Sequence, residues 1–184
     1  MSIEIIDNFL DKEYFNEFKS QIEGHTCPWH YRDDITTGEY SNNLCKYGFN
    51  HVILNDDGQK TSNFDLFGKF FYKMMEATGS KVIVRSRLDM TLNMGKSIVL
   101  EPHVDFFFKH ISSIFYVNNS DGNTLIYSQR YNEKDRYNQE LTVKQEIEPR
   151  ANRLLIFDGL LIHTGSTPSK HNRRILINTN FKYR

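Results

Sequence analysis

Cysteine is scarce in this chain. Its 184 residues include only Cys27 and Cys45, which are too few for a disulfide scaffold. Their spacing matches no zinc-binding pattern. We therefore expect two free thiols.

An excess of one charge and a long apolar run are also missing. The 23 basic residues balance the 23 acidic ones, so bulk electrostatics give no signal for a nucleic-acid partner, although a local basic groove is still compatible with this balance. No apolar run approaches the ~20 residues that span a bilayer, so no membrane partner is predicted either. The stretch MSIEIIDNFLDKEY lacks the basic and apolar regions of a signal peptide. We expect a soluble, cytoplasmic protein, and the sequence leaves its oligomeric state open.

Apolar and aromatic residues are plentiful enough for a folded core. They make up 39% and 14% of the chain, and this length suits one domain better than two. No internal repeat or low-complexity linker divides the sequence. We expect a single domain over 1–184, in which 1–80 supplies helices and loops and 81–184 supplies a β-rich core.

Two helices are predicted in the first part. The first has a stripe with spacings of four, begins after Asp11 and ends at Gly24; the stripe is Leu10, Tyr14, Phe18 and Ile22. The second is predicted within SNFDLFGKFFYKMMEATG, ends at Gly79, and presents one apolar face, which is Phe67, Phe70, Phe71 and Met74. Core packing explains these aromatics best.

From Lys81 onward the apolar period changes from helical to alternating. Along KVIVRSRLDMTLN one face is mostly apolar: Val82, Val84, Ser86, Leu88, Met90 and Leu92. The opposite face is mostly polar: Ile83, Arg85, Arg87, Asp89, Thr91 and Asn93. This pattern predicts a strand whose apolar face packs on the helices and whose polar face lines water or a cavity.

Further short strands follow within 109–119, 122–129, 141–149, 152–159 and 173–181, separated by Asn, Gly, Asp and Pro. Helices therefore come first and closely spaced strands come second. This order is typical of an α+β domain whose strands close into a sandwich or barrel.

A possible metal site begins in LEPHVDFFFKH. His103 and Asp105 are two residues apart, so on a strand they point to the same side. His163, in LLIFDGLLIHTGS, is the third candidate. Two histidines and one carboxylate form the facial triad of non-haem Fe(II) oxygenases, which leaves positions open for a bidentate cosubstrate and O2. An arginine at the start of the next strand suits the far carboxylate of such a cosubstrate.

The ordered set PHVD, IFYVNN, NRLLIFDGLLIHTGS and RRILINTNF resembles the Fe(II)/2-oxoglutarate-dependent dioxygenases. The resemblance covers roughly 80–184 and is closest to the compact prolyl-4-hydroxylase-like branch, which includes forms from phages and marine microbes. It implies a double-stranded β-helix, the cupin-like jelly-roll barrel, supported by the N-terminal helices. It also implies hydroxylation of a substrate C–H coupled to decarboxylation of 2-oxoglutarate, with Fe(II) and O2 as requirements and ascorbate as a stimulant.

The resemblance also assigns roles to individual residues. It implies that the iron ligands are His103, Asp105 and His163. It implies that the cosubstrate-binding residues are Arg174 and Tyr116, for the far carboxylate, and Asn93, as part of the pocket lining.

Arg173 competes with Arg174 for the carboxylate-binding role, because the loop HTGSTPSKHN is longer than the shortest version in the family. Strand alternation offers a test. If Arg174 points inward, then so do Leu176, Asn178 and Asn180, and the outward residues are Ile175, Ile177 and Phe181. A polar cosubstrate pocket favours Arg174.

Several points stay open at the sequence level. The segment 128–140 is either a lid over the substrate or a solvated insert. The same triad also suits a cupin-like isomerase or hydrolase with Zn2+ or Mn2+, or a ligand-binding barrel without catalysis. Substrates range from prolyl residues in a peptide or protein to small molecules such as free amino acids and nucleobases. The other histidines, including His110 and the pair in HTCPWH, are expected to be structural.

Overall fold

A computed structural model describes residues 2–33, 35, 47–61, 63–133 and 140–183. The elements, in chain order, are β1 (Glu4–Ile6), α1 (Lys12–Glu23), β2 (His30–Arg32), β3 (Gly48–Leu54), a 3-10 helix η1 (Phe64–Phe67), α2 (Gly68–Thr78), β4 (Ile83–Leu92), β5 (His110–Tyr116), β6 (Thr124–Arg130), β7 (Val143–Ile147), β8 (Arg153–Asp158), β9 (Leu161–Gly165) and β10 (Arg173–Lys182).

The strands form two antiparallel sheets. The larger sheet has the order β1-β8-β5-β10-β4-β3-β2, and the smaller has the order β7-β6-β9. Apolar side chains from both sheets meet in one buried cluster, which includes Ile114, Leu155 and Leu176 from the larger sheet and Ile126 from the smaller. The predicted α+β fold with a double-stranded β-helix is therefore confirmed.

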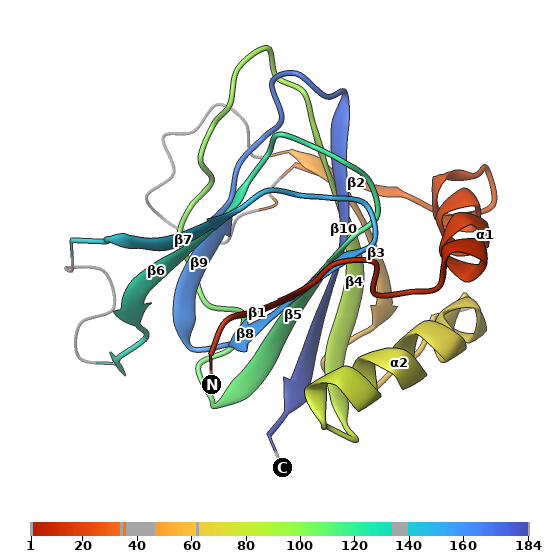
Figure 1. Cartoon of the computed structure of the whole chain (residues 1–184), viewed down its shortest axis with the longest axis horizontal. Helices are drawn as coiled ribbons and strands as arrows, with labels where there is room; N and C mark the ends of the chain where they lie inside the picture. Colours follow the sequence, from red (N-terminus) through yellow and green to blue (C-terminus); the bar gives the residue numbers. More distant parts are fainter. Residues whose placement is uncertain (1, 34, 36–46, 62, 134–139, 184) are drawn as a thin grey trace.

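Both helices cover the outer face of the larger sheet (Figure 1). Their aromatic residues and the outward residues of the sheet form the main core, in which Phe18, Phe67, Phe70 and Phe115 are buried. The side chain of Asp11 caps α1 by accepting from the backbone N–H of Tyr14 (2.9 Å). These two helices were predicted from the sequence; the start of the second is a 3-10 turn.

Alternation along β10 separates this core from the interior of the barrel. Ile175, Ile177 and Phe181 belong to the helix-side cluster. Leu176 belongs to the cluster between the sheets, and Arg174 and Asn178 line an interior cavity together with Leu176. Arg174 therefore points inward.

The predicted faces of β4 are correct in its middle and wrong at its start. Val82, predicted on the helix side, is 48% exposed, whereas Ile83, predicted on the polar face, packs against the helix-side core. The reason is a register shift: Asn180 pairs with Arg85, but the next residue, Phe181, pairs with Ile83. The extra residue moves the alternation by one position.

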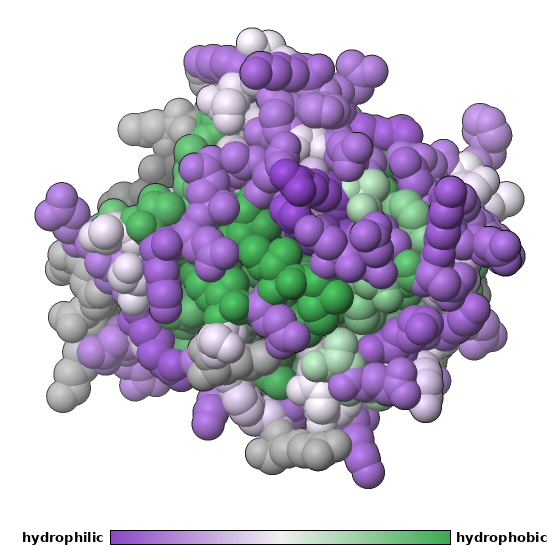
Figure 2. Space-filling model, in the orientation of Figure 1, coloured by the Kyte–Doolittle hydropathy of each residue, from purple (hydrophilic) through white to green (hydrophobic). Residues whose placement is uncertain are grey.

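The outer surface is largely polar, but apolar groups gather near the middle of the face in Figure 2, where Figure 1 places β1. Ile5 of this strand is 38% exposed. No helix in the described part of the chain is long and apolar enough to cross a bilayer.

Two sequence predictions can be compared with the structure only in part. Cys27 is buried and free, as expected, whereas Cys45 lies outside the described residues. Residues 134–139 of the segment that was predicted as a lid or an insert also lie outside them.

Candidate functional site

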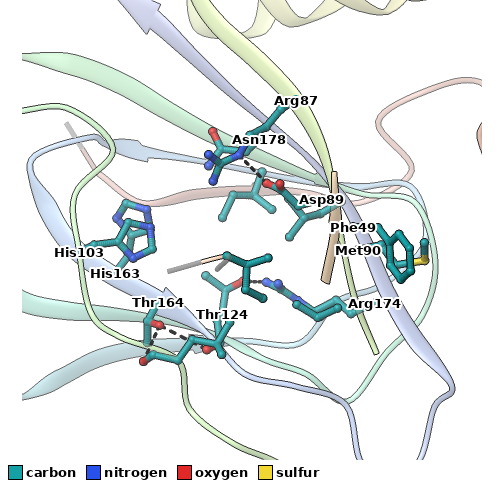
Figure 3. Close-up of a pocket in the computed structure, with 16 residues that line it drawn as sticks. Phe49, Arg87, Asp89, Met90, His103, Thr124, His163, Thr164, Arg174 and Asn178 are labelled. Atoms are coloured by element: carbon teal, nitrogen blue, oxygen red, sulfur yellow. Dashed lines mark hydrogen bonds and ion pairs between the residues drawn. The ribbon is translucent and has the colours of Figure 1, made fainter. Parts of the chain in front are cut away.

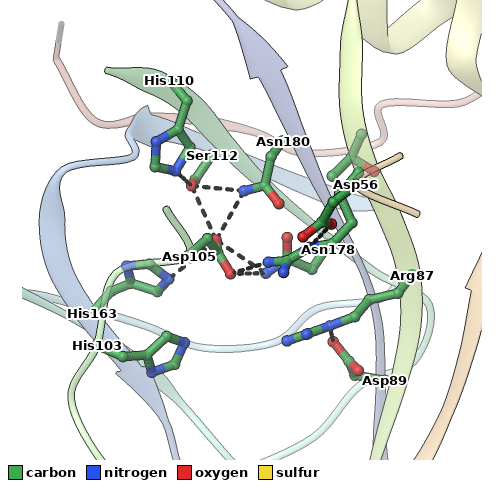
Figure 4. Close-up of polar contacts among 12 residues, drawn as sticks. Asp56, Arg87, Asp89, His103, Asp105, His110, Ser112, His163, Asn178 and Asn180 are labelled. Carbon is green, nitrogen blue, oxygen red and sulfur yellow. Dashed lines mark hydrogen bonds and ion pairs between the residues drawn. The ribbon is translucent and has the colours of Figure 1, made fainter. Parts of the chain in front are cut away.

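The three residues of the predicted triad meet inside the barrel. His103 and His163 are joined by a pair of backbone hydrogen bonds, each 2.9 Å long, which set the two side chains next to each other. Asp105 follows two residues later, and one ligand atom from each of the three residues lies within 4.8 Å of the others. Figure 4 shows the two imidazoles and the carboxylate pointing toward a common point.

Backbone carbonyls orient both imidazoles. Nδ1 of His103 lies 2.9 Å from the oxygen of Glu101, and Nδ1 of His163 lies 3.0 Å from the oxygen of Leu161. A carbonyl only accepts hydrogen bonds, so Nδ1 carries the proton and Nε2 presents a lone pair. Nε2 of His163 is buried, has no hydrogen-bond partner among the described residues and lies 3.6 Å from Oδ2 of Asp105. Two facing acceptors suit a cation between them.

The carboxylate of Asp105 is held by donors from three strands. Arg85 donates to Oδ1 (2.8 Å) from β4, and Asn180 donates to Oδ2 (2.9 Å) from β10. Asn178 and the hydroxyl of Ser112 add longer contacts of 3.2–3.4 Å. Since the side chain is only 1% exposed, these donors replace the water that an ionised carboxylate needs.

The protonation states suit metal binding. Burial raises the pKa of Asp105, but the neighbouring His163 and the charge of Arg85 outweigh it and hold the pKa well below its usual value. Burial lowers the pKa of His103 to about 4, and the neighbouring His163 acts in the same direction. A carboxylate and a neutral imidazole are the forms that bind a cation.

A cavity adjoins the triad, and Figure 3 shows its lining. His103 and His163 lie at one side, and Arg174 enters from β10. Arg174 is 6% exposed and donates to the hydroxyl of Thr124 on β6 (2.7 Å). The hydroxyl of Tyr116 donates to the same Thr124 oxygen (2.6 Å), and the guanidinium carbon lies 5.9 Å from the centre of the Tyr116 ring.

Several buried polar atoms that line this cavity have no hydrogen-bond partner in the described part of the chain. They are Oγ1 of Thr91, Nε2 of His163, Nε of Arg174 and Oδ1 of Asn178. Burying a polar group without a partner costs free energy. The cavity is therefore suited to a polar ligand that supplies the missing partners.

Three other predicted residues lie elsewhere. Arg173 has a 43% exposed side chain and forms an ion pair with Glu23 of α1 (3.1 Å), on the opposite side of β10 from the cavity. Asn93 was expected to line the cosubstrate pocket but is not among the residues of this cavity. It donates instead to the backbone oxygens of Ser169 (2.9 Å) and His171 (3.0 Å), because β4 ends at Leu92 and the alternation does not extend to it. Tyr116 is not among the residues that line the cavity, but it contacts two that are, Thr124 and Arg174.

The sequence assigned no role to Thr124, and it placed Arg85 and Asn180 on the cavity-facing sides of their strands without assigning them to Asp105. The inward position of Asn180 follows from the alternation of β10, so the sequence carried a signal for it. The contacts of Arg85 and Thr124 depend on how distant strands pair, and no local pattern indicates them.

The remaining histidines play no part in the triad. His110 is fully buried, and its Nδ1 lies 2.7 Å from the oxygen of Phe108. Its Nε2 lies 3.1 Å from the hydroxyl of Ser112. This is the structural role expected from the sequence.

The donor set fits a non-haem iron site: two imidazole nitrogens and one carboxylate oxygen are the ligands of the facial triad. A backbone carbonyl that accepts from Nδ1 is a usual support of a metal-binding histidine. It leaves Nε2 to bind the metal, and Nε2 of His163 has no hydrogen-bond partner among the described residues.

Solved structures share this fold. An α-ketoglutarate-dependent epimerase from nogalamycin biosynthesis, SnoN, superposes with a TM-score of 0.67 and 9% identity, covering 98% of this chain and 76% of that one. A prolyl-4-hydroxylase from Pseudomonas putida superposes with a TM-score of 0.61 and 12% identity, covering 99% and 92%. A prolyl hydroxylase from Trichoplax adhaerens, in complex with a hypoxia-inducible-factor peptide, gives 0.62 and 12%, covering 98% and 83%.

A sequence search of curated proteins found no match. The model of the 2OG-Fe(II) oxygenase superfamily matches residues 90–182, which is just over half of the chain and includes all three residues of the triad. The chain therefore belongs to the 2OG-Fe(II) oxygenase superfamily, as the motifs predicted, and has the fold of its prolyl hydroxylases.

Proposed function

We propose that this protein is an Fe(II)- and 2-oxoglutarate-dependent hydroxylase. The observation that carries the proposal is the convergence of His103, Asp105 and His163 within 4.8 Å beside a cavity that contains a buried arginine, Arg174. Membership of the oxygenase superfamily supports the same reaction class.

Fe(II) would be held by Nε2 of each histidine and by Asp105. With 2-oxoglutarate and O2, iron in such a site supplies oxidative decarboxylation of the cosubstrate to succinate coupled to oxidation of a substrate C–H. The chain contributes orientation: the carbonyls of Glu101 and Leu161 fix the imidazole rings, and Arg85 and Asn180 fix the carboxylate.

The far carboxylate of 2-oxoglutarate would be bound by Arg174 and Thr124. Burial lowers the pKa of Arg174, and its Nε has no hydrogen-bond partner in the part of the chain that the structure describes. A carboxylate would satisfy the charge and the donor together. Tyr116 would position Thr124 through its 2.6 Å hydrogen bond. A metal-dependent isomerase or hydrolase would not need a buried arginine beside its metal. The presence of Arg174 therefore favours 2-oxoglutarate as the ligand of this cavity.

The reaction that we propose is hydroxylation of a C–H bond. Two acceptor types should be tested first: a prolyl residue in a peptide or protein, and a small molecule. The solved structures of similar fold include enzymes named for each type.

The test is succinate formation from 2-oxoglutarate with Fe(II), O2 and ascorbate. Asp105→Ala should abolish turnover, because it removes a ligand. Arg174→Ala should raise the KM for 2-oxoglutarate about 30- to 100-fold, as expected for a lost charge-assisted pair. Arg173→Ala is the matched control and should change the KM less than about twofold, because its side chain lies on the other face of β10. Full turnover by Asp105→Ala, or an equal effect of the two arginine variants, would contradict the proposal.

A further inference from the structure

A second arginine, Arg87 on β4, projects into the cavity. Arg87 and Asp89 lie on the same side of this strand, and both line the cavity with His103 and His163. Nε of Arg87 donates to Oδ2 of Asp89 (2.8 Å), and the two side chains are 28% and 27% exposed. The pair is therefore accessible from the cavity.

The terminal nitrogens of Arg87 remain available. Asp89 occupies the Nε edge of the guanidinium. Among the residues that the structure describes, neither terminal nitrogen donates to a side chain or a carbonyl, and Figure 4 shows this end of Arg87 extending toward His103. An arginine has five donors in a fixed plane, and its two terminal nitrogens match the two oxygens of a carboxylate. Because Asp89 already fixes the plane, little side-chain entropy remains to be lost on binding.

Arg87 is distinct from the proposed 2-oxoglutarate residue. Arg87 pairs with Asn178 across the sheet, whereas Arg174 pairs with Thr91. The two arginines are therefore four strand positions apart, or about 13 Å along the sheet. Asn178 contacts Asp105, which places Arg87 level with the triad, at the place where a substrate must lie to react.

Apolar side chains also line the cavity. They include Phe49, Leu100, Ile114 and Leu176. Such a lining accommodates a carbon skeleton, while a single charged residue fixes its orientation.

Given the proposed function, we propose that Arg87, oriented by Asp89, binds a carboxylate of the substrate, and that the hydroxylated molecule is a small carboxylic acid. A prolyl residue inside a peptide, whose carboxyl group is an amide, lacks this group and should be a poor substrate.

The test compares matched acids and amides. Free and N-acetylated amino acids (L-proline included), 2-hydroxy acids and simple monocarboxylic acids are each assayed beside their primary amides for stimulation of succinate formation. Peptides with internal proline form a further arm. At least one acid should stimulate turnover with a kcat/KM at least about tenfold above that of its amide, the discrimination expected when a buried donor loses its partner.

Variants then assign the effect to Arg87. Arg87→Gln should raise the KM for that acid about 10- to 100-fold and leave the KM for its amide and for 2-oxoglutarate within about threefold, and Arg87→Lys should recover part of the loss. The matched control is Arg150→Gln, whose side chain is 60% exposed and pairs with Glu148 outside the cavity. It should change none of these constants.

A second readout does not depend on turnover. The melting temperature of the Co(II)-loaded protein should rise more with the acids than with their amides, and this difference should vanish in Arg87→Gln. If the acids stabilise the protein in this way but 2-oxoglutarate is never consumed, the proposed function fails, whereas the assignment of Arg87 to carboxylate binding stands.

Three results would overturn the inference while 2-oxoglutarate is consumed normally: no acid exceeds its amide; internal prolyl peptides are the better substrates; or Arg87→Gln raises the KM for 2-oxoglutarate instead. The last result would assign Arg87 to the cosubstrate.

Discussion

At the scale of single residues, Asp105 shows how the chain positions a proposed metal ligand. Its two oxygens contact different donors: Arg85 lies against Oδ1, and Asn180 lies against Oδ2. Oδ2 is also the oxygen nearest His163 (3.6 Å). The carboxylate can therefore offer Oδ2 to an ion while Arg85 holds Oδ1.

Removing one of these donors should loosen the ligand without removing it. Asn180→Ala should weaken Co(II) binding about tenfold, the usual scale for residues that support a metal ligand. The measurement is an anaerobic Co(II) titration followed by visible absorption, whose band shape also reports changes in coordination. Thr179→Val is a matched control, because the neighbouring Thr179 faces the other way and bonds Ser86 (2.9 Å). Equal affinities for the two variants would refute the positioning role.

The guanidinium of Arg174 lies so close to the backbone of Gly165 that a side chain there would collide with it. A Cβ built on Gly165 would lie 2.9 Å from Nη1 and 3.2 Å from Nη2 of that arginine. Gly165→Ala should displace the guanidinium and raise the KM for 2-oxoglutarate about tenfold, since small misplacements of a binding group are costly. Co(II) affinity should stay unchanged. Gly68→Ala, where a Cβ meets nothing within 4 Å, is the control, and an unchanged KM in Gly165→Ala would show that Arg174 has room to move.

At the scale of elements, Asp121 joins two turns. It lies between β5 and β6, and its carboxylate accepts from the backbone N–H groups of Ser169, Lys170 and His171, which precede β10, and from the side chain of Ser169. Burial raises its pKa, but the hydrogen bonds from Ser169 and His171 together prevail and hold the pKa well below the ordinary value. This carboxylate therefore stabilises the turn that leads into β10, the strand that carries Arg174.

The depressed pKa of Asp121 predicts a pH dependence. A carboxyl group with a folded pKa below its unfolded pKa of about 3.9 stabilises the fold above that pH, and this contribution declines as the pH falls further. Asp121→Asn should lower the free energy of unfolding at pH 7 by about 1 kcal/mol, a modest value because the site is partly exposed to solvent. In urea titrations the difference between wild type and variant should shrink below pH 4. A difference that is constant from pH 7 to pH 3 would exclude this role.

The elements also show what the sequence can and cannot predict. Apolar residues at spacings of four identify α1, and alternation places Arg174 on one face of β10 and Ile175 on the other. Both patterns can be predicted because they depend only on residues close together in the sequence. The bulge near Val84 was not predicted, since a register shift depends on the partner strand. The three-residue strands β1 and β2 were missed because so short a segment carries little periodicity.

At the scale of the whole molecule, the proposed metal site links the two sheets. Asp105 contacts β4, β5 and β10 of the larger sheet, whereas His163 belongs to β9 of the smaller one. An ion bound to both should stabilise the barrel as well as support chemistry. The order of motifs along the chain predicted this architecture, but no sequence pattern reveals that Thr124 lies beside Arg174.

Metal binding should therefore raise the free energy of unfolding. With Co(II) at 100 times its Kd, the expected gain is about 2.7 kcal/mol relative to the protein in EDTA. Urea denaturation of wild type and Asp105→Ala, each with and without Co(II), measures this gain, and the variant should show little of it. Equal stabilisation of both proteins would place the ion elsewhere.

The alternation of β10 has a consequence for how this protein can change. From Arg174 to Phe181, side chains on one face of the strand point into the barrel, and those on the other face pack in the hydrophobic core beneath the helices. Inserting or deleting a single residue here would turn isoleucine and phenylalanine toward the proposed metal site and bury asparagine and arginine among aromatic rings. Evolution and protein engineering can thus exchange side chains along this strand, but they cannot alter its length by one.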